Sequence, residues 1–353
     1  MSTSASGNTK PIALFLNCTR LDYDRKLDFD GMASITDFHR NDVDAVSAPA
    51  SGEQDTAAVV DEIVRLVNEV YSGTEILILK EMPLPKAAVE RFSDSVKLIC
   101  EAGTGYNNIP TEVCRSKNID VCNIPTYSTD AVAQTAITYV MNFAMNLLEQ
   151  QAMLQRNDRS NFTGPLTLPL MELCGKTLGL VGGAGRIGTR VAEIALVLGM
   201  KIVISSRSPE LPASHKLAGN PNVRVTSNVD ELLRESDFVS LHTPLNAATE
   251  GTFGKAQISK MKNTAYLINT SRGKVCNEDE LIECLGEGTI AGAGLDVTAM
   301  EPPSEDSELW NLPNVWLSPH IGWRRLETRQ RLVDMTVDNI RAYIDMEVIN
   351  KVN

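Results

Sequence analysis

A glycine-rich turn between a short apolar run and a helix pattern constrains this chain more than any other feature. The run at 178–181 leads into Gly183-x-Gly185-x-x-Gly188, and apolar residues at helical spacing follow from Val191 to Leu198. In that context glycines permit a tight turn and the close approach of a pyrophosphate, whose charge is met by backbone N–H groups at the helix N-terminus. The spacing therefore predicts a dinucleotide site. Its predicted contacts are Gly183, Gly185, Arg186, Ile187 and Gly188.

The end of the next apolar run indicates which dinucleotide binds. An NAD site usually carries a carboxylate roughly 20 residues past the glycines, where it bonds the ribose 2′-hydroxyl. Here Ser206 stands at that position, and Arg207 and Ser208 follow it. A guanidinium flanked by hydroxyls suits a 2′-phosphate. We therefore expect a preference for NADP(H), with NAD(H) as the other cofactor; the alternative is that Arg207 is a solvated surface charge.

Short apolar runs alternate with helix patterns along the chain, which is typical of βαβ units around parallel sheets. At 353 residues, and with roughly 150 residues per domain, two domains are expected. Strands are expected at 12–16, 76–79, 96–99 and 119–122, and then at 177–181, 201–204, 223–225, 238–241, 265–268, 289–292 and 315–317. A long helix is expected over 133–147, a polar linker at 157–169, and a final helix at 326–343 that packs on the first domain. The predicted fold class is α/β.

Composition argues against several kinds of partner. The chain has 33 Lys+Arg and 45 Asp+Glu, a net charge of −12, without a basic cluster that could neutralise a nucleic acid. No apolar run approaches the ~20 residues that span a bilayer. The 7 cysteines form no C-x-x-C pair and lie mostly in apolar stretches, as in a reduced, cytoplasmic protein. Residues 1–10 are expected to be a flexible tail, and no metal site is predicted.

Reduction of a carbonyl by hydride transfer needs a proton donor, and the chain has 4 histidines that could serve. His39 and His215 lie in polar stretches and are interpreted as surface groups. His242 begins His242-Thr243-Pro244 after the strand at 238–241; contact with the cofactor through its backbone and a buried, satisfied role both fit. His320 follows the strand at 315–317, at the edge where such sheets bind ligands.

An arginine and a carboxylate join His320 at this predicted edge. Arg272 follows the strand at 265–268, and Glu301 lies beyond the strand end at Asp296. A carboxylate partner stabilises protonated histidine and orients its ring. Each residue singly could belong to a structural salt bridge. The combination beside a dinucleotide fold favours catalysis.

Motifs over nearly the whole chain resemble the D-isomer-specific 2-hydroxyacid dehydrogenases. Besides the glycine turn they are Gly103-Thr104-Gly105-Tyr106-Asn107-Asn108, Asn123-x-Pro125-x-x-Ser128, Asn269-Thr270-Ser271-Arg272-Gly273, Gly294-Leu295-Asp296-Val297, Glu301-Pro302 and Ser318-Pro319-His320. Within the family, the segments most similar to glycerate dehydrogenases, also called hydroxypyruvate reductases, are 104–108, 127–134, 301–303, Trp323 and 328–332.

This resemblance implies a role for each matching residue. His320 is expected to be the acid/base, Glu301 its partner, and Arg272 the group that binds the substrate carboxylate and polarises the carbonyl. Backbone N–H groups of Thr104 and Gly105 would help hold the carboxylate, while Asp296 would bond the nicotinamide carboxamide. Trp323 either lines the substrate pocket or packs at the domain junction. Further expected cofactor contacts are His242, Thr243, Pro244, Thr249, Thr270, Ser271, Arg272, His320 and Gly322.

The family also implies two Rossmann-like or flavodoxin-like domains and a homodimer formed through the nucleotide domain. The expected substrate domain is discontinuous, comprising 11–125 and 324–353, and the expected NAD(P) domain is 126–323. One departure is an extra residue before the glycine motif, counted from Lys176. Either the strand is longer or the turn is wider, so the identity of the phosphate-contacting N–H groups stays open.

The predicted reaction is reversible hydride transfer to C2 of a short 2-keto acid, with hydroxypyruvate or glyoxylate favoured. Pyruvate, phenylpyruvate and 3-phosphohydroxypyruvate are alternative substrates. A related formate dehydrogenase is disfavoured, because that group carries Gln where Glu301 stands. A different class, the dinucleotide-sensing corepressors, shares this fold, and fold alone does not decide between them.

Overall fold

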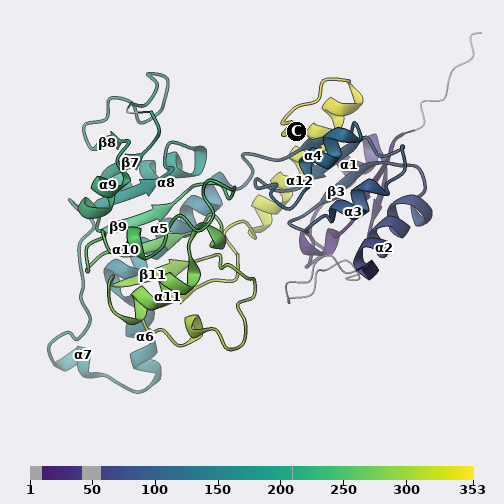
Figure 1. The fold of residues 1–353 in the computed structure, drawn as a ribbon. Helices are drawn as coiled ribbons and strands as arrows, with labels where there is room; N and C mark the ends of the chain where they lie inside the picture. The colour runs from purple at the N-terminus through teal and green to yellow at the C-terminus, as the bar shows by residue number, and fades with distance from the viewer. Residues whose placement is uncertain (1–9, 42–56, 209) are drawn as a thin grey trace, which may run out of the picture. The chain divides into compact units, whose positions relative to one another are not determined.

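The computed structural model describes residues 10–41, 57–208 and 210–353. Contacts divide the chain into two compact units, Met1–Tyr127 with Arg324–Asn353, and Ser128–Trp323. Except for Lys10, the tail expected at 1–10 lies outside the described residues. Figure 1 shows the first unit in purple and blue with its yellow C-terminal part, and the second in teal and green.

The first unit is built on a parallel sheet of five strands in the order β2-β1-β3-β4-β5. This is the flavodoxin-like order of a doubly wound sheet. Its strands are β1 (Ile12–Phe15), β2 (Asp37–Arg40), β3 (Thr74–Leu79), β4 (Leu98–Glu101) and β5 (Asp120–Cys122). The central strands are largely apolar, as expected where helices cover both faces of a sheet.

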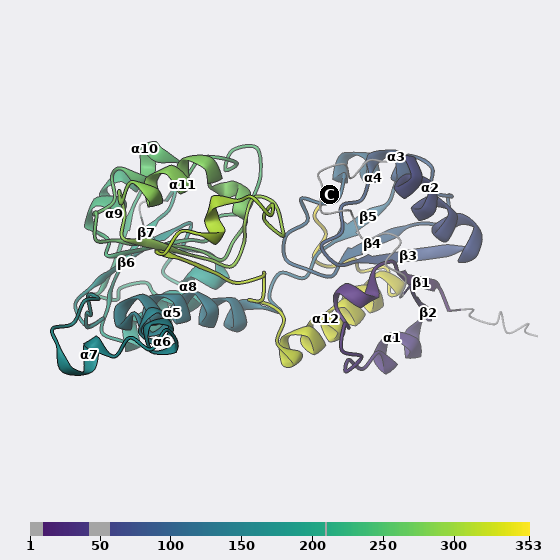
Figure 2. The ribbon, with the colours of Figure 1, turned by 90° about the horizontal axis from the view of Figure 1, so that it is seen from below.

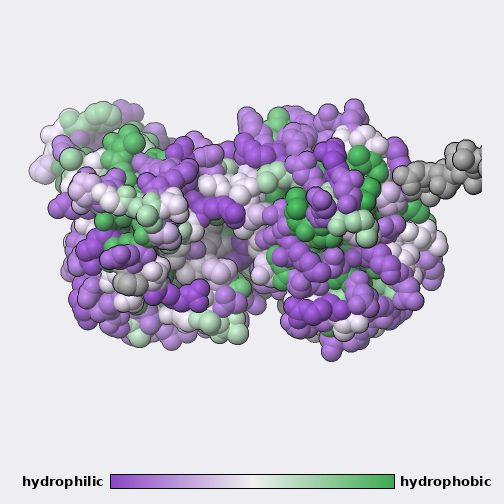
Figure 3. Space-filling view, turned by 90° about the horizontal axis from the view of Figure 1, so that it is seen from above, coloured by the Kyte–Doolittle hydropathy of each residue, from purple (hydrophilic) through white to green (hydrophobic). Residues whose placement is uncertain are grey.

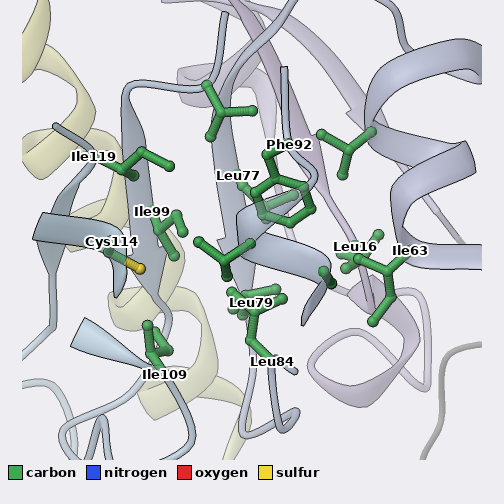
Figure 4. Close-up of a cluster of buried hydrophobic side chains, with 14 of the residues drawn as sticks. Leu16, Ile63, Leu77, Leu79, Leu84, Phe92, Ile99, Ile109, Cys114 and Ile119 are labelled. Carbon is green, nitrogen blue, oxygen red and sulfur yellow. The ribbon is translucent and has the colours of Figure 1, made fainter. Parts of the chain in front are cut away.

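Helices α2 (Ala57–Arg65), α3 (Lys86–Glu90) and α4 (Thr111–Ser116) contribute to the main apolar cluster of this unit. In Figure 4, Ile63 of α2, Phe92 after α3 and Cys114 of α4 pack around Leu77 and Ile99 of the sheet. Each such large side chain contributes about 1.5–3 kcal/mol on burial. The unit also contains α1 (Asp30–Ile35), α12 (Leu326–Ile344), the 3₁₀ turn η1 (Cys18–Arg20) and a π-helical turn, η3 (Leu66–Val70).

The end of the chain returns to this unit. In α12, Asn339 donates a hydrogen bond from Nδ2 to the carbonyl of Asn123 at 3.0 Å. Beyond the helix, the backbone N–H of Val352 donates to the carbonyl of Val121 at 2.8 Å. These bonds make the C-terminal segment part of the first unit although it is remote in sequence.

The second unit has a parallel sheet of seven strands in the order β12-β11-β10-β9-β6-β7-β8. The strands are β6 (Thr177–Val181), β7 (Lys201–Ser205), β8 (Val223–Thr226), β9 (Phe238–Leu241), β10 (Tyr266–Asn269), β11 (Gly292–Leu295) and β12 (Val315–Leu317). The order reverses between β6 and β9, and this switch point is where doubly wound sheets bind ligands. The predicted α/β class with two parallel sheets is confirmed.

Helices cover both faces of the second sheet. Figure 2 shows α5 (Thr129–Met145), α6 (Leu147–Gln155) and α8 (Arg186–Val197) on one face. On the other face lie α9 (Val229–Glu235), α10 (Lys255–Ile258) and α11 (Glu278–Gly286). The unit also contains α7 (Ser160–Thr163) and the 3₁₀ turns η4 (Gly273–Val275) and η5 (Glu308–Trp310).

The structure corrects several sequence predictions. The strand expected at 289–292 is wrong, because β11 is Gly292–Leu295. Its glycines disfavour a strand locally, but a Cβ on Gly294 would lie 2.5 Å from the Tyr139 ring, so packing requires glycine there. The long helix breaks at Asn146, which has a φ of 47°. The expected linker contains α7, and α1 and β2 were not predicted.

The face of the molecule in Figure 3 is largely hydrophilic, with separate hydrophobic patches. Among the described residues, no helix is both long enough and apolar enough to cross a membrane.

Candidate functional site

The glycine turn occupies Gly182–Gly185, between the end of β6 and the start of α8. A Cβ on Gly188 would lie 2.5 Å from the Cα of Gly183, and a Cβ on Gly183 would overlap Leu180. Packing within the chain therefore requires both glycines. A Cβ on Gly185 would meet nothing closer than 3.8 Å. The absence of a side chain at Gly185 leaves the N-terminus of α8 accessible, as a bound pyrophosphate needs.

The turn after β9 lies directly against this glycine turn. Gly182 has a φ of 75°, and a Cβ there would lie 2.7 Å from Cγ2 of Thr243. The backbone N–H of His242 donates to the carbonyl of Val181 at 2.8 Å. The two turns thus form one edge at the switch point of the sheet.

Buried polar atoms gather at that edge. His242 Nε2, Thr243 Oγ1 and Thr270 Oγ1 are buried without a hydrogen-bond partner among the described residues. Burial lowers the pKa of His242 to about 4, so the imidazole is neutral at physiological pH. Leaving buried polar atoms unpaired costs about 1–3 kcal/mol each, which a polar ligand offsets. The interpretation of His242 as a buried histidine with all its hydrogen bonds satisfied therefore does not hold. His242, Thr243 and Thr270 together fit a dinucleotide, which would offer them polar partners.

The segment predicted to select the cofactor follows β7, the strand next to β6. Ser206 is held by its backbone N–H, which donates to the carbonyl of Thr226 at 3.0 Å. The N–H of Ser208 donates to Oγ of Ser206 at 3.3 Å. Arg207 is exposed and forms no ion pair with any residue that the structure describes. Its guanidinium is thus available to an anionic ligand.

His215 was interpreted as a surface group, but it is only partly exposed and its ring is hydrogen-bonded to other segments. Its Nδ1 accepts a hydrogen bond from the N–H of Leu217 at 3.2 Å, so Nε2 is the ring nitrogen that can donate. Nε2 lies 3.3 Å from the carbonyl of Ala184 and 3.1 Å from Oγ1 of Thr189. The ring therefore ties the segment after β7 to the glycine turn, a long-range contact for which the sequence carries no local signal.

Three neighbouring strands lead to segments that carry predicted catalytic and cofactor-binding residues at the same edge. Asn269, Leu295 and Leu317 are in register across β10, β11 and β12. Arg272 follows the first of these strands, Asp296 the second and His320 the third. Because the strands are parallel, all three segments leave the sheet on one side.

Asn269 organises the loop that carries Arg272. Its Oδ1 accepts hydrogen bonds from the N–H and the Oγ of Ser271 at 3.0 and 2.8 Å, and its Nδ2 donates to the carbonyl of Arg272 at 2.9 Å. One nitrogen of the guanidinium, Nη1, donates to the carbonyl of Ser271 at 2.8 Å. The arginine therefore leaves a preformed turn.

His320 and Glu301 form a direct pair. Nδ1 of the imidazole lies 2.7 Å from Oε2 of Glu301, and the two side chains are 15% and 34% exposed. His320 has a φ of 49°, a left-handed conformation that costs about 1–3 kcal/mol outside glycine and occurs mainly at functional sites. The carboxylate fixes the ring orientation, so the other nitrogen, Nε2, is the one that can face a substrate.

Asp296 holds the loop that carries His320. Its Oδ2 accepts a hydrogen bond from the N–H of Gly322 at 2.8 Å, and its Oδ1 accepts from the N–H of Ile321 at 2.9 Å. Oδ1 also accepts from the hydroxyl of Ser318. A carboxylate offers about four acceptor positions. Three of these positions are occupied by the bonds described above, so the predicted bond to a nicotinamide carboxamide would use the fourth.

The other predicted site residues are placed as follows. The Thr249 hydroxyl donates within its own loop to the carbonyl of Pro244 at 2.5 Å. Trp323 is buried. In the first unit, the carbonyl of Thr104 accepts a bond from Nδ2 of Asn123 at 2.7 Å, and Gly105 follows it in the same loop. Within the described ranges, no group of three or more His, Cys, Asp or Glu side chains could hold a metal ion.

A glycine turn at the switch point of a doubly wound parallel sheet, with unpaired polar atoms around it, defines a dinucleotide-binding fold. The family pattern described as D-isomer specific 2-hydroxyacid dehydrogenase, NAD binding domain, matches residues 137–322. The chain belongs to the D-isomer-specific 2-hydroxyacid dehydrogenase family. It is an NAD(P)-dependent oxidoreductase acting on a CH–OH group, which favours the enzyme over the corepressor alternative.

Two curated relatives and one solved structure show the range of similarity. The chain is 33% identical over 301 residues to hydroxypyruvate reductase of Blautia hydrogenotrophica, covering 83% of this chain and 88% of that one. It is 38% identical over 256 residues to glyoxylate reductase of Thermococcus litoralis, covering 72% and 75%. The structure of an acyclic imino acid reductase in complex with NADPH and D-Arg superposes with a TM-score of 0.80 at 26% identity, covering 97% and 100%.

Proposed function

We propose that the chain catalyses reversible hydride transfer between a nicotinamide and C2 of hydroxypyruvate or glyoxylate, with NADP(H) preferred. The observation that carries this proposal is the 2.7 Å bond between Nδ1 of His320 and Oε2 of Glu301 at the sheet edge that also bears Arg272. The names of the two curated relatives, a hydroxypyruvate reductase and a glyoxylate reductase, support this substrate class.

In the reductive direction, a nicotinamide held by these residues would supply the hydride. His320 donates a proton from Nε2 to the carbonyl oxygen of the substrate, and Glu301 stabilises the imidazolium before that transfer. Arg272 binds the substrate carboxylate and polarises the carbonyl, with backbone N–H groups of Thr104 and Gly105 as further donors to the carboxylate. In this proposal Trp323 lines the substrate pocket.

Around the cofactor, the α8 N-terminus at Gly183, Gly185 and Arg186–Gly188 binds the pyrophosphate, and Asp296 bonds the carboxamide. Ser206, Arg207 and Ser208 bind the 2′-phosphate, because a guanidinium and two hydroxyls suit a phosphate and a carboxylate is missing. The NADPH named for the imino acid reductase supports this preference. In this proposal, 11–125 with 324–353 binds the substrate, and 126–323 binds the cofactor.

We propose further that the protein is a homodimer through its nucleotide unit. Large apolar side chains are exposed along α5, α6, α7 and the following segment, and such a concentration is typical of an interface. They are Met141, Met145, Leu147, Leu148, Leu154, Phe162, Leu166 and Leu170. The double variant Phe162→Asp/Leu166→Asp is expected to sediment as a monomer, whereas exposed Val197→Asp on α8 should sediment as the wild type does. A wild-type monomer would overturn this part.

The reaction is tested by following absorbance at 340 nm with hydroxypyruvate, glyoxylate, pyruvate and phenylpyruvate, each with NADPH and with NADH. We expect hydroxypyruvate or glyoxylate with NADPH to give the highest kcat/KM, and His320→Ala to lose the activity. A higher kcat/KM for pyruvate or phenylpyruvate would contradict the substrate assignment. Equal kcat/KM for NADH and NADPH would contradict the cofactor preference.

A further inference from the structure

We infer that Tyr139 and Ser318 are positioning residues for His320, acting through the carboxylate of Asp296. This inference rests on the proposed function, in which His320 exchanges the proton. It assigns a positioning role to a buried phenol in α5, which is remote in sequence from Arg272, Glu301 and His320.

The three side chains form one hydrogen-bonded chain. The hydroxyl of Ser318 contacts Oδ1 of Asp296, and the hydroxyl of Tyr139 lies 2.7 Å from Oγ of Ser318. An ionised carboxylate can only accept, so the Ser318 hydroxyl donates to Asp296 and must accept from Tyr139. Burial raises the pKa of Tyr139, so the phenol keeps its proton and remains a donor.

Packing of the Tyr139 ring fixes the position of its hydroxyl group. The Tyr139 side chain is buried, and its ring lies against β11 at Gly294, where any Cβ would be 2.5 Å from Cδ1 of the ring. Gly294 lies in β11, two positions before Asp296, which directly follows that strand. The ring therefore has little freedom to move away from Ser318.

The loop from Ser318 to Gly322 is bonded to Asp296 along its length. The N–H of His320 donates to the carbonyl of Asp296 at 2.9 Å, and the N–H groups of Ile321 and Gly322 donate to its carboxylate. The only side-chain bond in this set comes from Ser318. The Ser318 hydroxyl therefore links the loop to Tyr139 of α5 as well as to Asp296 after β11.

These hydrogen bonds matter because the backbone of His320 is held in a left-handed conformation, with a φ of 49°. A residue in that conformation relaxes unless its surroundings hold it there. Relaxation would turn the ring away from Glu301, and misplacing a reacting group by about 1 Å costs roughly 10²-fold in rate. Tyr139 and Ser318 thus affect the rate of proton transfer without touching the substrate.

The test compares Ser318→Ala, Ser318→Thr and Tyr139→Phe with the wild type, in the full chain with NADPH and hydroxypyruvate. We expect kcat to fall about tenfold in Ser318→Ala and less in Tyr139→Phe, since a loosened loop misplaces the ring only part of the time. KM for NADPH should stay within about twofold, and Ser318→Thr, which keeps the hydroxyl, should restore most of kcat. Tyr343→Phe is the matched control, because it removes a phenol bonded to Glu75 in the first unit.

A readout independent of turnover is the nitrogen NMR spectrum of the protein labelled with ¹⁵N-histidine, which contains 4 imidazoles. The His320 signals, assigned by their loss in His320→Gln, should shift in Ser318→Ala and not in Ser318→Thr. Signals of the other imidazoles should stay in place, which separates local repositioning from a general loss of structure.

Unchanged kcat and unchanged His320 signals in both Ser318→Ala and Tyr139→Phe would overturn the inference. So would a rise in KM for NADPH at constant kcat, which would make these residues part of cofactor binding. If the wild type reduces no 2-keto acid, the proposed function fails instead, and an unmoved His320 signal then also refutes the positioning role.

Discussion

Gly273 packs so tightly on the backbone of Thr298 that a Cβ at position 273 would overlap the Thr298 carbonyl group. The loop that carries Arg272 therefore touches, backbone against backbone, the loop that leads to Glu301. Ala299, next to Thr298, is held in turn by its N–H, which donates to Oε2 of Glu278 at 2.7 Å. These contacts fix the Arg272 loop relative to the loop that bears the partner of His320.

Replacing Gly273 by alanine is expected to separate the two loops. Backbone atoms cannot move aside as a flexible side chain can, so we expect a loss of about 1–3 kcal/mol in the free energy of unfolding. We also expect kcat/KM for hydroxypyruvate to fall by about 10²-fold. Denaturant unfolding and steady-state kinetics measure the two effects. Gly286→Ala is the control, since a Cβ there meets nothing within 4 Å; equal behaviour of the two variants would refute the argument.

Replacing Glu301 by glutamine removes the charge that faces Nδ1 of His320 while keeping the size of the side chain. The imidazolium loses its stabilising carboxylate, so we expect kcat for hydroxypyruvate reduction to fall by about 10²-fold, with KM for NADPH little changed. Glu305→Gln, a nearby exposed position, serves as the control. A Glu301→Gln enzyme with wild-type kcat would remove Glu301 from the mechanism.

Cofactor preference depends on Arg207. Losing a hydrogen bond to a charged group costs about 1.5–3 kcal/mol, so Arg207→Ala should raise KM for NADPH roughly 10-fold to 150-fold and leave KM for NADH nearly unchanged. Ser206→Asp should favour NADH, because the carboxylate repels a 2′-phosphate and bonds a 2′-hydroxyl. Initial rates measured over a range of NADPH and NADH concentrations give the KM for each cofactor. Lys201 is an exposed cation at the start of β7, so Lys201→Ala should change neither KM. If Lys201→Ala raises KM for NADPH as much as Arg207→Ala does, the effect comes from net charge and not from a contact between Arg207 and the 2′-phosphate.

Acid should destabilise the protein partly through His242. Burial lowers the pKa of this imidazole from 6.5 to about 4, so between these values the unfolded chain binds a proton that the folded one does not. The stabilisation is present above pH 6.5 and is lost as pH falls toward 4. We therefore expect the unfolding temperature of the wild type to fall more steeply from pH 7.5 to pH 5 than that of His242→Gln. Parallel curves would show that the imidazole titrates normally.

Much of the fold was predictable from local patterns. Strands in a doubly wound sheet are continuous apolar runs because helices cover both faces, so β9 and β12 were predicted with the bounds that the structure shows. Motifs such as the turn at Gly183 have a fixed spacing because steric contact with neighbouring residues demands it. The prediction failed at β11, where Gly292 and Gly294 lack strand propensity and are required by the partners that pack on them.

Residue types and their order along the chain predicted Arg272, Glu301 and His320 at one sheet edge, because parallel strands end at one edge. In the structure Arg272 follows β10 and His320 follows β12 at that edge. Sequence could not place His215 against the glycine turn, nor Tyr139 against Ser318, because those contacts join segments far apart in the chain. Only packing in three dimensions brings such groups within hydrogen-bond distance. The left-handed conformation of His320 was decided in the same way, because it persists through bonds to Asp296 that no local pattern encodes.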